Sequence, residues 1–242
     1  MIAALTLSIL LQLTPQEIYD RADWWVHLEV TVDETSPSGT RSLTGWSGGF
    51  IIDDRGAKLV ITVAHIEGRG QTARRIMVHF RDYLRLEPQP AYIYSRHQSY
   101  DIAALRFSDE NFVFPGQVAR LGSAYRLRRG DQLVSLGSPM PLDERFYLSQ
   151  GVFNELAARG TEIRHTCLTT YGNSGGPLVN MNGEVVGMNF RFTKADEGEH
   201  SPLDSTVLLP HHGTPCPYSI WSTARPIDLI RDTLPYLRRR TR

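Results

Sequence analysis

The apolar residues near the start of the chain alternate with polar residues at a period of two. Val26, Leu28 and Val30 are separated by His27 and Glu29. Because successive side chains of a β-strand point to opposite faces, this alternation predicts a strand with one buried face.

Two continuous apolar runs follow, at 47–52 and 58–63, with the turn-forming residues 53–56 between them. Such a pair predicts a β-hairpin. Further strands are predicted at 76–80, 91–94, 102–107, 132–136, 148–153, 162–166, 177–179, 185–190 and 218–224. Many short strands at fairly even spacing, with little helix, indicate antiparallel barrels or a sandwich.

Helical signals are found near the two ends. Thr14 and Glu17 have the spacing of a capping box, with proline at the first helical position, and predict a short helix to about Arg21. A closing helix is predicted from Pro226, because apolar residues recur there at helical spacing. Residues 111–121 are expected to link two strand-rich halves, and 193–217 to form an exposed loop.

Residues 1–13 are mostly apolar but too short to span a bilayer as a helix. They are interpreted as a signal-like or anchoring segment, which predicts an exported (periplasmic or extracellular) or membrane-tethered protein. Any membrane contact is expected only through this segment. The alternative is a helix or strand packed on the domain.

Composition narrows the possible partners and cofactors of this chain of 242 residues. Lys plus Arg equals Asp plus Glu, at 26 each, so no strong field favours nucleic acid. The eight histidines lack metal-ligand spacing, and neither a metal nor another cofactor is expected. Cys167 and Cys216 leave two alternatives open, one disulfide bridge or two small buried hydrophobic residues.

Three short segments carry the candidate chemistry. His65 ends an apolar strand, Asp101 opens another, and Ser174 lies in the run Gly172-Asn173-Ser174-Gly175-Gly176. The first two are weak signals alone, while the third is specific. Glycines leave room for a substrate beside a nucleophile and allow consecutive N–H groups to point to one place. The N–H groups of Gly172 and Ser174 are therefore a candidate oxyanion hole.

These three residue types together predict nucleophilic catalysis. A serine hydroxyl needs a base at neutral pH, and histidine, with an unperturbed pKa near 6.5, can take and return a proton. A carboxylate holds the imidazole in the correct tautomer. We therefore assign Ser174 as nucleophile, His65 as general base and Asp101 as orienting acid. The chain order His, Asp, Ser differs from that of the subtilisins and α/β-hydrolases.

The chain resembles the HtrA/Deg group of trypsin-like serine peptidases over about residues 14–234. The resemblance is carried by the glycine-led strand at 47–52, by 127–139 at the start of the second half, and by 149–152 and 180–189 around the serine motif. It implies two six-stranded antiparallel β-barrels of the chymotrypsin-like kind, with a short N-terminal helix and a C-terminal helix.

The resemblance also implies an organisation and a substrate pocket. The implied peptidase domain covers 14–242, with an N-terminal barrel at about 24–114, a C-terminal barrel at about 118–224 and a closing helix at about 226–237. The pocket for the residue before the cut would be lined by two segments. Its residues would be Leu168, Thr169, Thr170, Tyr171, Asn189, Phe190, Arg191 and Phe192.

Three departures from related peptidases change the expectations. Leu168 stands where trypsins carry the aspartate that selects basic side chains, so cutting after lysine or arginine is not expected. Asn173 replaces the aspartate of the zymogen switch, so no activation of that kind is expected. The group usually carries a PDZ domain, and the chain ends at the closing helix. We expect an endopeptidase acting on protein or peptide substrates; the alternative is an inactive two-barrel protein that only binds.

Overall fold

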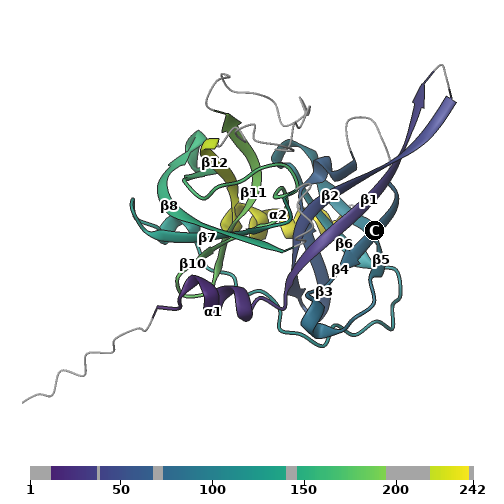
Figure 1. Ribbon diagram of the computed structural model, residues 1–242, viewed down its shortest axis with the longest axis horizontal. Coiled ribbons are helices and arrows are strands. Elements are labelled where there is room, and N and C mark those ends of the chain that lie inside the picture. The colour runs from purple at the N-terminus through teal and green to yellow at the C-terminus, as the bar shows by residue number, and fades with distance from the viewer. Residues whose placement is uncertain (1–11, 37–38, 68–72, 140–145, 195–218, 240–242) are drawn as a thin grey trace, which may run out of the picture.

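The computed structural model describes residues 12–36, 39–67, 73–139, 146–194 and 219–239. Figure 1 shows two β-barrels beside each other. The first consists of β1 (Trp25–Ser36), β2 (Gly39–Asp54), β3 (Ala57–Thr62), β4 (Ala73–His79), β5 (Gln89–His97) and β6 (Ile102–Phe107). The second consists of β7 (Gln132–Gly137), β8 (Tyr147–Ala157), β9 (Glu162–His165), β10 (Pro177–Asn180), β11 (Val185–Lys194) and β12 (Ser219–Pro226).

Each barrel is a closed six-stranded sheet with antiparallel pairing. The strand order is β1-β2-β3-β6-β5-β4 in the first and β10-β11-β12-β9-β8-β7 in the second. Closure gives each strand a neighbour on both sides, although residues 39–49 of β2 have strand pairing with β1 alone. The predicted fold class is therefore confirmed, and every predicted strand overlaps an observed one. The hairpin predicted across 47–63 is the pair β2–β3, in register at Phe50 and Ile61.

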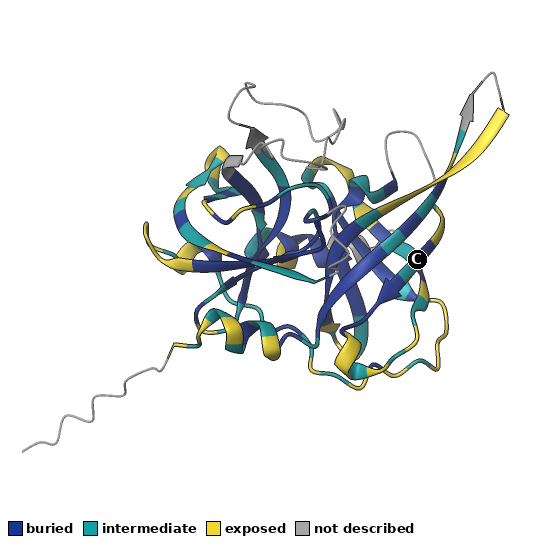
Figure 2. Ribbon diagram, viewed as in Figure 1, coloured by how far each residue is buried: buried dark blue, intermediate teal, exposed yellow. Residues whose placement is uncertain are grey.

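The apolar side chains of β1 point into the barrel interior, as the alternation in the sequence predicted. Val26 and Leu28 are fully buried, and Figure 2 shows this inner lining in contrast to the exposed far end of the β1–β2 hairpin. The opposite face of β1 is not fully exposed to solvent, although its polar residues had suggested that it would be. His27 is also buried, stacked against Trp46 at 5.0 Å between ring centroids.

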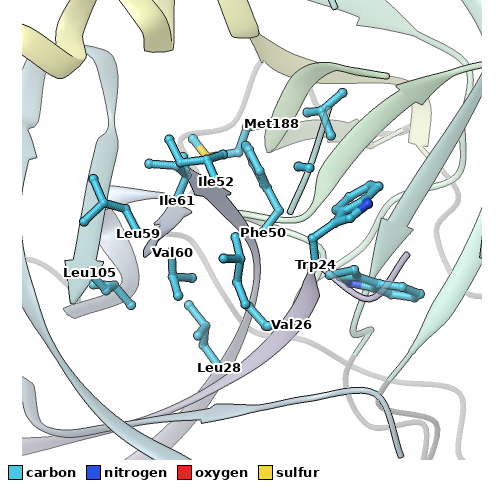
Figure 3. Packing of buried hydrophobic residues seen from close by; sticks show 14 of the residues in the cluster. Trp24, Val26, Leu28, Phe50, Ile52, Leu59, Val60, Ile61, Leu105 and Met188 are labelled. Carbon is cyan, nitrogen blue, oxygen red and sulfur yellow. The ribbon is translucent and has the colours of Figure 1, made fainter. Parts of the chain in front are cut away.

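The two barrels share part of their hydrophobic core. Met188 of β11 belongs to the same cluster as Phe50, Ile52 and Ile61 of the first barrel, and Figure 3 shows it beside them. All four side chains are almost completely buried. Since burying such a side chain contributes about 2 kcal/mol, this shared core holds the barrels in a defined relative position.

Two helices complete the chain. α1 (Pro15–Asp20) begins with the predicted capping box, in which the Thr14 hydroxyl and the Glu17 carboxylate cap each other's backbone N–H. α2 (Ile227–Arg239) follows β12 directly and contacts β5, β11 and β12. Short 3₁₀ helices are η1 (Ala64–Glu67), η2 (Asp82–Leu84), η3 (Gln98–Tyr100), η4 (Ala124–Arg126) and η5 (Ala158–Gly160). Within the described residues, no helix combines the length and the hydrophobicity that a transmembrane span requires.

Some expectations fall on other parts of the chain. Residues 1–11 of the signal-like segment, most of the loop 193–217 and Cys216 lie outside the described residues. Cys167 is a buried free thiol among the described residues, and burial raises its pKa to about 12. The predicted linker 111–121 lies between β6 and β7.

His165 of β9 lies fully buried inside the second barrel. Burial lowers its pKa from 6.5 to about 3, and the Asn189 amide opposes this shift to a smaller extent. Below about pH 6.5 the unfolded chain binds a proton at this residue and the folded chain does not. The contribution of His165 to folding stability should therefore decrease as the pH falls below about 6.5.

The variant His165→Gln isolates this contribution from those of other titrating groups. We expect its urea-unfolding free energy to depend less steeply on pH than that of the wild type below about pH 6.5. Parallel curves for the two proteins would contradict the assignment.

Candidate active site

The strand arrangement of the first barrel places His65 and Asp101 at one edge. His65 lies in η1, which follows β3, and Asp101 directly precedes β6. β3 and β6 are antiparallel neighbours, with Thr62 opposite Ala103. The end of one strand therefore meets the beginning of the other, and the two residues face each other across this edge.

Both oxygens of Asp101 contact His65. Oδ2 lies 2.6 Å from the ring Nδ1, and Oδ1 accepts a hydrogen bond of 2.9 Å from the His65 backbone N–H. The two side chains are 23% and 18% exposed, so the pair is partly accessible to solvent. A ring whose Nδ1 proton is held by a carboxylate presents Nε2 as a base.

The backbone at Asp101 is left-handed, with φ 56° and ψ 47°. Aspartate tolerates this region better than most residues, at some cost in energy. The Asp101 N–H donates to the Gln98 carbonyl at 3.1 Å, which closes η3. Within that turn the His97 ring stacks on Tyr100, with centroids 4.5 Å apart. These contacts hold the short loop that carries the carboxylate.

Ser174 is bound to the first barrel through its backbone. It lies in the loop between β9 and β10, and its carbonyl accepts hydrogen bonds of 2.7 Å from the Gly48 N–H and the Ser47 hydroxyl. Both donors belong to β2, the neighbour of the strand that leads to His65. The cross-barrel contact therefore brings the serine loop to the edge that carries His65 and Asp101.

The glycine after the serine makes this approach possible. Gly175 has φ 81°, and a Cβ there would lie 2.2 Å from the Gly48 carbonyl oxygen and 2.3 Å from the Thr62 hydroxyl. Thr62 is three residues before His65. From the sequence, these glycines are explained by substrate access and N–H orientation. The structure adds a further reason, which is close packing of the loop on the first barrel.

No hydrogen bond joins the Ser174 hydroxyl to the His65 ring within the part of the chain that the structure describes. Contacts of this kind are often long without substrate and shorten in the complex. The Gly172 and Ser174 N–H groups donate to none of the described residues, and Gly172 has φ 87°. Both N–H groups are thus without an acceptor in the described part of the chain.

The eight predicted pocket residues divide into two groups. Thr169, Asn189 and Phe190 are buried in the second barrel, where the Thr169 hydroxyl lies 2.6 Å from that of Ser222. The Asn189 amide donates to the Ser135 hydroxyl at 2.9 Å and to the Gly176 carbonyl at 3.1 Å. These side chains support the wall of the site from within.

The other predicted pocket residues are accessible. Leu168 is 41% exposed, Thr170 is half-buried, and Tyr171 meets Phe192 edge to face, with centroids 5.1 Å apart. Arg191 forms an ion pair of 3.2 Å with Glu162, which compensates the charge of the guanidinium. The accessible residues of the two segments thus comprise the aliphatic Leu168 and the aromatic pair Tyr171 and Phe192, together with Thr170 and the ion-paired Arg191.

Two side chains at this contact were not predicted as site residues: Ser47, which binds the Ser174 carbonyl, and Thr62, whose hydroxyl donates to the Gly48 carbonyl at 2.8 Å. No single-sequence pattern marks them, because each lies in an ordinary strand. Among the described residues no group of three or more His, Cys, Asp or Glu side chains is placed to hold a metal ion.

Comparisons with known proteins agree with this architecture. A model of the trypsin-like peptidase domain matches residues 47–188. "Serine protease HTRA2, mitochondrial" of Drosophila erecta is 34% identical over 164 residues, which cover 64% of this chain and 36% of the relative. The protein of the same name from Drosophila grimshawi is 32% identical over 169 residues, 66% of this chain and 37% of the relative. The chain therefore spans little more than a third of the length of these relatives.

Solved structures show the same fold at lower identity. "HtrA-type protease AlgWS227A with decapeptide" has a TM-score of 0.70 and 17% identity, covering 92% of this chain and 66% of the other. "HtrA-type protease AlgW with decapeptide" has a TM-score of 0.68 and 18% identity, covering 95% and 69%. The predicted resemblance to HtrA peptidases is confirmed by these matches together with the sequence relatives.

Proposed function

Because the chain belongs to the trypsin-like peptidase family, we propose that it is a serine endopeptidase with Ser174, His65 and Asp101 as its catalytic triad. The observation that carries this proposal is the double contact between Asp101 and His65, through the ring Nδ1 and the backbone N–H. A carboxylate that holds both ring and backbone fixes the tautomer and the direction of the base. The serine loop is bound at the same edge through Gly48.

In the proposed reaction, His65 Nε2 takes the proton from the Ser174 hydroxyl as the oxygen attacks the peptide carbonyl. The imidazolium then gives this proton to the leaving amine, and an acyl-enzyme forms. Water, deprotonated by the same ring, releases the acid product. Asp101 stays ionised and stabilises the imidazolium. A modest movement of the Ser174 hydroxyl or the His65 ring is required, since no hydrogen bond joins them among the described residues.

The Gly172 and Ser174 N–H groups are proposed to bind the oxyanion. Their support is that neither donates to a described residue, and that the positive φ of Gly172 suits a turned backbone. Losing one such donor costs on the order of 3 kcal/mol of transition-state stabilisation.

Protein or peptide segments are the proposed substrates. The structural neighbours are described as complexes with a tripeptide or a decapeptide, which supports peptide binding by this architecture. Export or membrane tethering through residues 1–13 stays a proposal that rests on their apolar sequence.

A fluorophosphonate probe tests the proposal directly, because only an activated serine reacts with it. We expect stoichiometric labelling of the wild type and none of Ser174→Ala. Ser123→Ala, which changes a serine elsewhere on the surface, should be labelled like the wild type. If a folded wild-type protein is not labelled, the binding-only alternative replaces the peptidase.

We further propose that the residue before the cut is apolar. Leu168, Tyr171 and Phe192 offer apolar surface there, and Arg191 is paired with Glu162. A leucine cannot neutralise a lysine or arginine side chain, so these substrates would lose their charge solvation without compensation. A peptide-library cleavage profile should show cuts after small to medium apolar residues. Leu168→Asp should shift the profile toward basic residues, and predominant wild-type cutting after lysine or arginine would refute the proposal.

A further inference from the structure

Arg225 of β12 reaches from the second barrel to the loop that carries Asp101. Its Nε donates a hydrogen bond of 2.9 Å to the Tyr100 carbonyl. Its Nη1 lies 3.1 Å from the Thr161 carbonyl and 3.5 Å from Glu162 Oε1. The guanidinium is 3.9 Å from the Phe190 ring centroid, and the side chain is 11% exposed. It is therefore held from several directions.

The bond to Tyr100 acts on one peptide group. The Tyr100 carbonyl and the Asp101 N–H belong to the same planar peptide unit. Arg225 holds its carbonyl, and Gln98 holds its N–H at 3.1 Å. This unit precedes a residue with φ 56°, a left-handed conformation that costs energy for a side chain other than glycine. Removing either partner makes rotation of this peptide, and displacement of the Asp101 carboxylate, easier.

The charge of Arg225 acts in addition to its geometry. Burial lowers the pKa of the guanidinium, and the Glu162 and Asp101 carboxylates oppose that shift. With Arg191, which pairs with Glu162, these groups are two cations and two anions, and Asp101 is the one among them that contacts His65. His97 and Tyr100, whose rings stack on each other, are the other titratable side chains of the loop. Loss of the Arg225 charge leaves two carboxylates and one cation, which favours the imidazolium form of His65.

We propose that Arg225 is a positioning residue. It holds the Tyr100–Asp101 peptide across the barrel interface, and through this peptide the Asp101 carboxylate that orients His65. The inference rests on the proposed peptidase function. The position of the triad would then depend on the contact between the barrels, because Asp101 lies on the first barrel and Arg225 on the second.

The test measures the rate constant of fluorophosphonate labelling over the pH range in which a histidine titrates. For Arg225→Met we expect a plateau rate about 10- to 100-fold below the wild type, because small displacements of catalytic groups have effects of this size. The acidic limb of the pH–rate profile should shift to higher pH by about half a unit or more. Arg225→Lys keeps the charge but not the planar fork, so its limb should stay in place while its plateau falls.

Arg164→Met is the matched control. Arg164 lies on the neighbouring strand β9 opposite Thr223 and pairs with Glu155 at 2.8 Å. We expect a wild-type plateau and limb for this variant. Thermal unfolding of each variant shows what fraction is folded, and rates are expressed per folded molecule.

The possible outcomes separate this inference from the proposed function. A wild type that is not labelled at Ser174 refutes the peptidase itself. A labelled wild type with Arg225→Met unchanged in plateau and limb refutes only the role of Arg225. A variant that loses thermal stability but keeps the wild-type limb and rate per folded molecule refutes it as well. If Arg225→Met does not fold, a wild-type plateau in Arg225→Lys overturns the inference.

Discussion

Replacing His65 or Ser174 with alanine should lower kcat for a peptide substrate by about a millionfold, with a small change in KM. The reason is that a serine hydroxyl without a base, or a base without a hydroxyl, cannot start the acyl transfer. The two losses should not add in the double variant, because both residues act in one step. The measurement is hydrolysis of a fluorogenic peptide with an apolar residue before the cut.

Ser123→Ala provides the control for this experiment. Ser123 precedes η4, and its side chain makes no capping hydrogen bond there. We expect its turnover to equal that of the wild type. Near-wild-type turnover in either His65→Ala or Ser174→Ala, after purification from contaminating peptidases, would show that the triad is assigned wrongly.

The second large effect is expected for Asp101→Asn, with kcat reduced by about 10⁴-fold and KM close to the wild-type value. The amide oxygen can replace Oδ1 and accept from the His65 backbone N–H, at 2.9 Å in the wild type. The amide NH2 then faces Nδ1, where Oδ2 lies at 2.6 Å. Nδ1 must accept a hydrogen bond, so the ring proton moves to Nε2 and the ring cannot take the serine proton.

Asp82→Asn is the matched control for the carboxylate, because Asp82 is exposed on η2. It should leave kcat unchanged. An Asp101→Asn variant with wild-type kcat would show that the contact with His65 only supports the fold. A variant with raised KM and unchanged kcat would indicate that the carboxylate acts on substrate binding instead.

The strands could be predicted because their apolar residues follow a local period. Val26 and Leu28 face inward as the alternation requires, and the 47–63 hairpin forms at its predicted turn. The local pattern left barrels and a sandwich as alternatives, and the family resemblance favoured two barrels. Closure depends on pairs such as β1 with β4, which are far apart along the chain and carry no local signal.

The pocket shows why residue positions were predicted better than side-chain directions. Thr169 and Asn189 occupy the two predicted segments, yet both side chains point into the second barrel. A strand residue faces either the barrel interior or the cleft, and register and bulges decide which. β11 shifts register between Asn189 and Arg191, directly at this wall.

By itself the amino-acid sequence determined the strands, the capped first helix and the three residue types that suit nucleophilic catalysis, since each depends on neighbours in the chain. Only the tertiary structure decided how Asp101 binds His65 and how Gly175 lets the serine loop lie against Gly48. The same holds for the hydrogen bond from Arg225 to the Tyr100 carbonyl. These contacts join residues that are 36 to 127 positions apart in the chain. Their partners are selected by the packing of two closed barrels, which no local pattern encodes.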